Sequence, residues 1–77
     1  MAEVERILRA YGDDDALVGE WPITGLRLQK LQELFGQADD MYDSYPVHRE
    51  QAAALERATG ITLDLDRYAY FVDAGAV

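Results

Sequence analysis

The sequence contains no cysteine, and this absence removes two common ways of stabilising a small domain. Without thiols the chain forms neither disulfides nor thiolate metal sites, a composition that fits a reducing compartment such as the cytoplasm. It also lacks any apolar run near the roughly 18 residues of a membrane span, since the longest such stretch is residues 68–72. The first residues alternate charged and apolar side chains and lack the continuous apolar core of a signal peptide. We therefore expect a cytoplasmic protein without membrane contact.

Basic residues are also scarce, with 7 lysines and arginines against 15 acidic residues and a net charge of −8. Such a surface repels nucleic acid and anionic membranes, whereas it attracts basic protein surfaces. We therefore predict a protein partner with a basic surface and no direct contact with nucleic acid. The 77 residues suffice for one domain, residues 1–77, and the 49% hydrophobic content predicts that this domain folds. Because a domain this small has a thin stability margin, a homodimer remains an alternative.

The side chains that carry catalysis are few. His48 is the only histidine and Ser44 is the only serine. A triad of these two with Asp43 is disfavoured, because triads are assembled from separated parts of a larger fold and need an oxyanion site. The acidic run of residues 13–15 lacks the spacing of a calcium loop, and a chain this short rarely builds the deep cleft of a glycosidase. The sequence therefore predicts no enzyme activity, no metal and no cofactor.

Three segments have the apolar content of strands. Residues 4–11 and 16–23 flank a turn of one glycine and three aspartates, which predicts a hairpin, although a helix over residues 2–10 also fits the first segment. Pro22 lacks an N–H and indicates either an edge strand or the end of the strand. The third region, residues 61–74, is apolar on both faces, which is typical of a central strand. The second strand is expected to place four residues on one face: Leu17, Gly19, Trp21 and Ile23.

Two segments have helical periodicity. Residues 24–36 carry an apolar stripe, with Thr24 as the expected N-cap and Gly36 as the left-handed residue that follows the helix. Residues 48–59 form a second helix, which Gly60 ends. The order of elements is therefore ββααβ. This order predicts an α+β fold, with a three-stranded antiparallel sheet and two helices on one face of it.

Carboxylates and tyrosines occur together in two segments, residues 39–46 and 64–70. Tyrosine is enriched at protein interfaces because it combines a large apolar area with a polar tip, and aspartates pair with the arginines or lysines of a partner. The alternative is that the tyrosines anchor these segments to the core. The predicted partner-binding residues are Asp39, Asp40, Tyr42, Asp43, Tyr45, Asp64 and Asp66.

Five runs of residues carry a resemblance to a known type of protein. They are Leu31-Gln32-Glu33-Leu34-Phe35-Gly36, Met41-Tyr42-Asp43-x-Tyr45-Pro46-Val47, Gln51-Ala52-x-x-Leu55, Thr59-Gly60 and Asp64-Leu65-Asp66-x-Tyr68-x-Tyr70-Phe71-Val72. In these runs the chain resembles a group of small, uncharacterised bacterial proteins, and the likeness covers most of its length. The resemblance implies an immunity protein or antitoxin, which is the partner of a secreted toxin, and it transfers no set of functional residues.

The acidic charge and the resemblance together favour a non-enzymatic inhibitor. In this hypothesis the chain is an immunity protein that binds a basic toxin domain, for example a nuclease, and blocks it. One alternative is an acidic mimic of nucleic acid that inhibits a DNA-targeting enzyme, which requires carboxylates spaced like phosphates over one surface. The other alternative is a structural or homodimeric module, in which the edge strand that contains Trp21 pairs with its copy.

Overall fold

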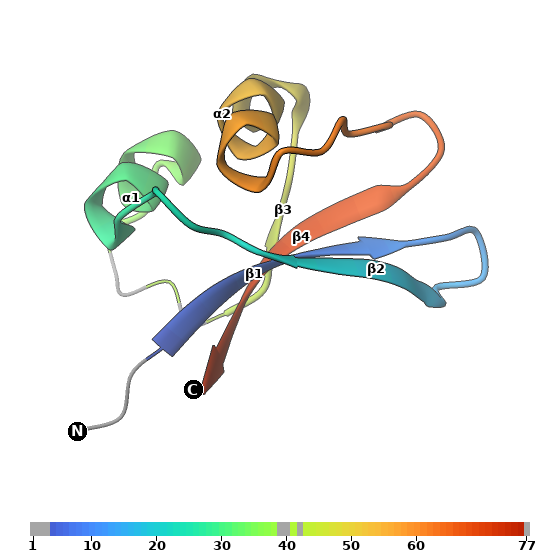
Figure 1. Ribbon diagram of the computed structural model, residues 1–77, viewed down its shortest axis with the longest axis horizontal. Coiled ribbons are helices and arrows are strands. Elements are labelled where there is room, and N and C mark those ends of the chain that lie inside the picture. The colour runs from blue at the N-terminus through green and yellow to red at the C-terminus, as the bar shows by residue number, and fades with distance from the viewer. Residues whose placement is uncertain (1–3, 39–40, 42, 77) are drawn as a thin grey trace.

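The computed structural model describes residues 4–38, 41 and 43–76, which form four strands and two helices. The strands make one antiparallel sheet in the order β2-β1-β4-β3, and both helices lie on the same face of it (Figure 1). The predicted α+β class is confirmed. The predicted three strands and the ββααβ order are wrong, because a short fourth strand lies between the helices. In chain order the elements are β1 (Val4–Tyr11), β2 (Leu17–Pro22), α1 (Leu28–Phe35), β3 (Tyr45–Pro46), α2 (Arg49–Thr59) and β4 (Ala69–Ala76).

The predicted hairpin is present, and β1 has the predicted bounds. Its turn is closed by the Gly12 N–H, which donates to the Ala16 carbonyl at 2.9 Å. Tyr11 pairs with Leu17 but Ala10 pairs with Gly19, so β2 carries one extra residue, a bulge at Val18. An extra residue reverses the two-residue alternation of a strand, and it places Leu17 on the face opposite to Trp21. The prediction of one shared face is therefore wrong for Leu17, whereas Gly19 and Trp21 share the helix-covered face, since they pair with buried residues of β1.

The first helix begins later than predicted. Gly25 has a left-handed φ of 78°, which ends any helical run from Thr24, and α1 starts only after Arg27 at the N-cap position. Thr24 therefore does not cap the helix. The predicted end is confirmed, because Gly36 adopts a φ of 64° and its N–H points back at the carbonyls of the last turn.

The second helix is tied to the first by one glutamine. Gln51 Oε1 accepts a hydrogen bond of 2.7 Å from the backbone N–H of His48, the residue at the N-cap of α2. The Nε2 of the same side chain donates to the carbonyl of Leu34 in α1 at 3.3 Å. The predicted stop at Gly60 is confirmed, with a φ of 77° and an N–H that donates to the Glu56 carbonyl at 2.8 Å. Gln51 thus stabilises both the start of α2 and its position beside α1.

Only the second half of the third predicted strand, residues 61–74, forms a strand, because β4 begins at Ala69. Residues 61–68 are not part of the sheet, and side chains accept the hydrogen bonds of two of their backbone N–H groups. The N–H of Leu63 donates to Glu56 at 2.8 Å, and that of Asp64 donates to the hydroxyl of Tyr70 at 3.1 Å. The segment then turns at residues 65–67 before β4 begins. As predicted, β4 is central, with β1 on one side and β3 on the other.

The core lies between the helices and the sheet. Tyr70 and Val72 of β4 point into it, and Leu31 of α1 and Leu55 of α2 cover them from above. Strand β3 pairs with β4 through only two residues, a length too short to show alternation in the sequence. The buried core residues are Leu8, Ala10, Ile23, Leu31, Met41, Val47, Leu55, Tyr70 and Val72.

Candidate binding face

The helices cover one face of the sheet, and no described helix covers the other (Figure 1). Leu8 and Ala10 of β1 are buried under the helices, so their neighbours Ile7, Arg9 and Tyr11 lie on the opposite face. We call this second face the open face. Its residues, taken from the strand register, are Glu5, Ile7, Arg9, Tyr11, Leu17, Glu20, Pro22, Pro46, Ala69, Phe71, Asp73 and Gly75.

A network of three charged side chains crosses the open face. Arg9 of β1 binds Glu20 of β2 through Nε at 3.0 Å and Asp73 of β4 through Nη1 at 3.1 Å. The hydrogen bond to Glu20, and then the bond and charge of Asp73, raise the pKa of Arg9 above its ordinary value. Asp73 is only 8% exposed, and its Oδ1 is buried without a hydrogen-bond partner. The network therefore holds a buried carboxylate between three strands.

Aromatic and aliphatic side chains form the other half of the open face. The rings of Tyr11 and Phe71 meet edge to face, with centroids 5.7 Å apart and planes at 77°. Leu17 pairs across the hairpin with Tyr11 and is 48% exposed, which is high for a large apolar side chain. Next to the rings the surface forms a hollow of about 350 Å³, lined by Tyr11, Asp15, Ser44, Ala69 and Phe71. Apolar side chains that stay accessible on one face are a common feature of interaction surfaces.

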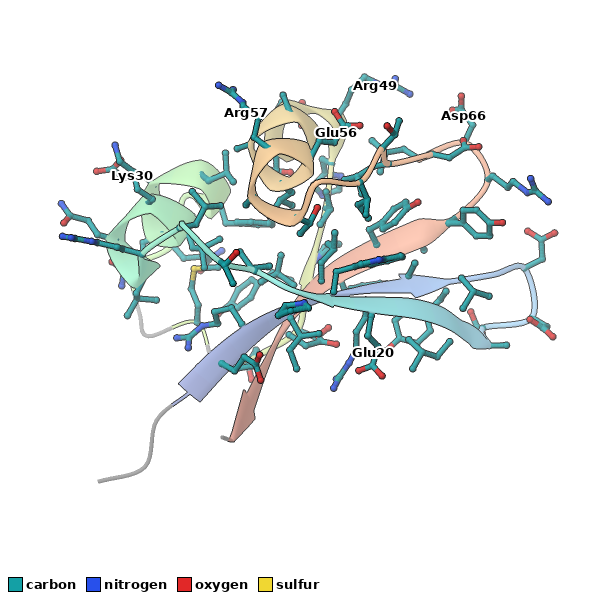
Figure 2. All side chains as sticks on the ribbon, viewed as in Figure 1. Glu20, Lys30, Arg49, Glu56, Arg57 and Asp66 are labelled. Atoms are coloured by element: carbon teal, nitrogen blue, oxygen red, sulfur yellow. The ribbon has the colours of Figure 1, made fainter. Side chains whose placement is uncertain are left out.

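Among the described residues, most of the excess negative charge lies in the hairpin and β4. Residues 27–36 and 48–68, which include both helices, contain five acidic and five basic side chains. Residues 4–22 and 69–76, which form the hairpin and β4, contain six acidic and two basic side chains. In Figure 2 labelled residues of both signs lie on the helix side of the sheet, and Glu20 lies on the other side; the former are Lys30, Arg49, Glu56, Arg57 and Asp66. The open face is therefore the part of the surface where apolar side chains and net negative charge coincide.

The first group of predicted binding residues, those of segment 39–46, does not lie among the residues of the open face. Asp39, Asp40 and Tyr42 lie outside the described residues, so their predicted role stays untested. Asp43 is exposed. Tyr45 is half-buried and faces α1, with its ring centroid 6.2 Å from that of Phe35. This tyrosine packs against the core, as the alternative interpretation of its segment held.

The second group lies beside the start of α2. Asp64 and Asp66 occupy the turn before β4 instead of a strand, because the Asp64 carbonyl accepts the N–H groups of Arg67 and Tyr68. Asp66 forms an exposed ion pair of 3.5 Å with Arg49 of α2 (Figure 2). The carboxylate of Asp66 is therefore paired with a cation on the helix side, and the binding role of Asp64 and Asp66 stays a prediction.

Sequence reasoning did not select the residues of the open face. The alternation of Tyr70 and Val72 with Phe71 and Asp73 indicated two faces of one strand. Both faces of this strand contain aromatic residues, so the local sequence pattern does not indicate which face the helices cover. The exposed Leu17 was assigned to the face of Trp21 because a bulge has no reliable sequence signal.

The residues considered for catalysis line two neighbouring hollows. Ser44 lines the hollow on the open face, whereas His48 lines a groove at the start of α2 together with Arg49 and Asp66, and both hollows are also lined by Ala69 and Phe71. Within residues 4–38, 41 and 43–76, no three histidine or acidic side chains are grouped as metal ligands. No helix in that part of the chain is long and apolar enough to cross a bilayer.

The fold and this face define the class of the protein, an α+β domain with an acidic, partly apolar sheet face that its helices leave open. The chain belongs to the family described as Domain of unknown function (DUF7683), whose model matches residues 5–73. This match extends from β1 into β4 and includes most of the open face. Comparison with curated proteins gave no match, and comparison with solved structures gave none either.

Proposed function

We propose that the protein is a non-enzymatic binding module, specifically an immunity protein that neutralises a basic bacterial toxin domain by direct binding. The observation that supports this function is the coincidence, on the open face, of exposed apolar side chains with the net negative charge of the sheet. Apolar contact supplies affinity, while the carboxylates accelerate encounter with a basic surface and disfavour acidic partners. Binding through this surface requires no catalytic residue.

The size of the domain is compatible with this function. A standard protein interface buries about 800 Å² on each partner. That area is about 15% of the 5201 Å² accessible surface of this chain, so one face of the sheet is a sufficient platform. Shielding a toxin active site requires no more than such a contact.

The distribution of carboxylates favours a protein interface over mimicry of nucleic acid. A mimic needs its acidic groups arranged along one surface like phosphates. Here five of the described acidic side chains lie in residues 27–36 and 48–68, where an equal number of basic side chains accompanies them. Most of the excess negative charge of the described residues lies in the hairpin and β4, beside apolar residues of the open face, which a phosphate-like surface does not need.

Two adjacent residues allow a matched test of the binding face. Leu17 and Val18 are both exposed, at 48% and 55%. Leu17 pairs with Tyr11 on the open face. Val18 instead lines a hollow on the helix side, together with Trp21 and Tyr70. Leu17→Lys and Val18→Lys change the net charge equally. Wild type and both variants are immobilised, exposed to extract of the source cell at low and high salt, and the retained proteins are identified.

The expected result is a basic protein that wild type and Val18→Lys retain, and that Leu17→Lys or high salt releases. The partner is then purified, its growth arrest of cells is measured, and co-expression of the chain is expected to relieve that arrest. Retention of the same partner by Leu17→Lys would place the interface elsewhere. An association rate that salt does not change, or a partner whose toxicity the chain does not reduce, contradicts the proposed function.

A further inference from the structure

The hollow on the open face has the chemistry of a cation site. Two of the residues that line it are Tyr11 and Phe71, whose ring planes stand at 77° to each other. The face of an aromatic ring attracts a cation, and a flat guanidinium stacks on it with the least loss of hydration. Tyr11 lies on β1 and Phe71 on β4, the two central strands of the sheet. Tyr11 pairs with Ala69 and Phe71 pairs with Arg9, so the strand pairing fixes the positions of both rings.

The third wall is an unused carboxylate. Asp15 lies in the hairpin turn with a left-handed φ of 59°, and its backbone N–H donates to the Gly12 carbonyl at 3.0 Å. Its side chain has no hydrogen bond or ion pair with any described residue. The neighbouring Asp14 differs, because its Oδ1 accepts the N–H of Ala16 at 3.2 Å. Asp15 is therefore the carboxylate of the turn that both lines the hollow and has free acceptor oxygens.

We propose that this hollow is a subsite for one arginine side chain of a basic protein partner. The guanidinium stacks on one of the two rings, Tyr11 or Phe71, and meets the other with its edge, while its forked N–H donors bind the carboxylate of Asp15. The hydroxyl of Ser44, which also lines the hollow, adds a further acceptor at its rim. The net charge of −8 on the chain selects a cation over an anion, and the rings select a planar cation over a compact ammonium. This subsite rests on the proposed function and specifies the partner chemistry it uses.

The subsite is tested without a partner protein, with N-acetyl-arginine amide as the probe and N-acetyl-citrulline amide as its uncharged isostere. The ring signals of Tyr11 and Phe71 and the amide signal of Asp15 are followed by NMR during titration with each compound. We expect saturable shifts of these signals with the arginine probe and much smaller shifts with citrulline. The change Asp15→Asn is expected to weaken the arginine probe about two- to fivefold, as loss of one exposed ion pair implies.

Asp13→Asn is the matched control, because it removes the same charge from the same turn at an exposed residue that does not line the hollow. It is expected to leave the dissociation constant unchanged. Equal shifts from citrulline show a neutral apolar site, and equal weakening by both asparagine variants shows diffuse attraction to the turn. Either result, or the absence of shifts at the rings, overturns the subsite. Because no partner is present, each of these outcomes is independent of the capture experiment that tests the proposed function.

Discussion

Gly19 in β2 is the position where a single methyl group has the most specific expected effect. The indole of Trp21 lies across this glycine, so a Cβ added at residue 19 would be 2.4 Å from Cη2 and 2.8 Å from Cζ2 of the ring. Ordinary contact between carbon atoms is about 3.5–4.0 Å. In Gly19→Ala the ring must therefore withdraw by about 1 Å or rotate, which disturbs its packing against the core.

The magnitude follows from two opposing effects. Forcing an extra methyl group into a packed site costs about 1–3 kcal/mol, whereas replacing glycine by alanine restricts the unfolded chain and returns about 0.4–1 kcal/mol. The free energy of unfolding of Gly19→Ala is therefore expected to fall by about 1–2 kcal/mol. For a domain of this size the corresponding decrease in Tm is roughly 4–16 °C.

The assay uses the fact that Trp21 is the only tryptophan of the chain. Urea unfolding is followed by circular dichroism for stability and by tryptophan emission for the position of the indole. The control is Gly12→Ala in the same hairpin, whose new Cβ meets Val18 Cγ1 at 3.5 Å, an ordinary contact. The control is expected to be as stable as wild type or more stable by up to about 1 kcal/mol, because it has the same effect on the unfolded chain without the clash. If Gly19→Ala is as stable as wild type and its emission is unchanged, the close approach of the indole to Gly19 is wrong.

Two further changes test the links between strands and between helices. Arg9→Leu leaves Asp73 buried without its cation and is expected to cost about 1–3 kcal/mol, less than a fully buried pair because Arg9 is 31% exposed. Glu20→Gln, at the exposed end of the same network, is expected to cost less than about 1 kcal/mol, and equal losses for both changes would refute the central role of Asp73. Gln51→Ala removes the hydrogen bond that caps α2 and the one to α1, and calorimetric unfolding is expected to show a loss of about 1–2 kcal/mol. The exposed Gln29→Ala in α1 is its near-neutral control, and a Gln51 variant equal to that control would show that neither hydrogen bond contributes.

The sequence by itself determined the local structure wherever a physical signal lies within a few residues. Gly36 and Gly60 end the helices because glycine adopts their left-handed φ without strain, so the identity of a single residue predicts each helix end. The aspartate-rich turn after Gly12 joins two strands for an equally local reason. The apolar character of both faces of β4 correctly indicated a central strand.

Only the tertiary structure decided which surface is available to a partner. The period of two in β4 separates Tyr70 from Phe71, but both rings are apolar, and the packing of the helices alone determines that Tyr70 is buried and Phe71 remains partly exposed. Pairing with distant residues likewise creates β3, which is too short to have a pattern, and moves Leu17 to the open face through the bulge. The open face therefore depends on contacts between residues far apart in the chain, and such contacts leave no local periodicity in the sequence.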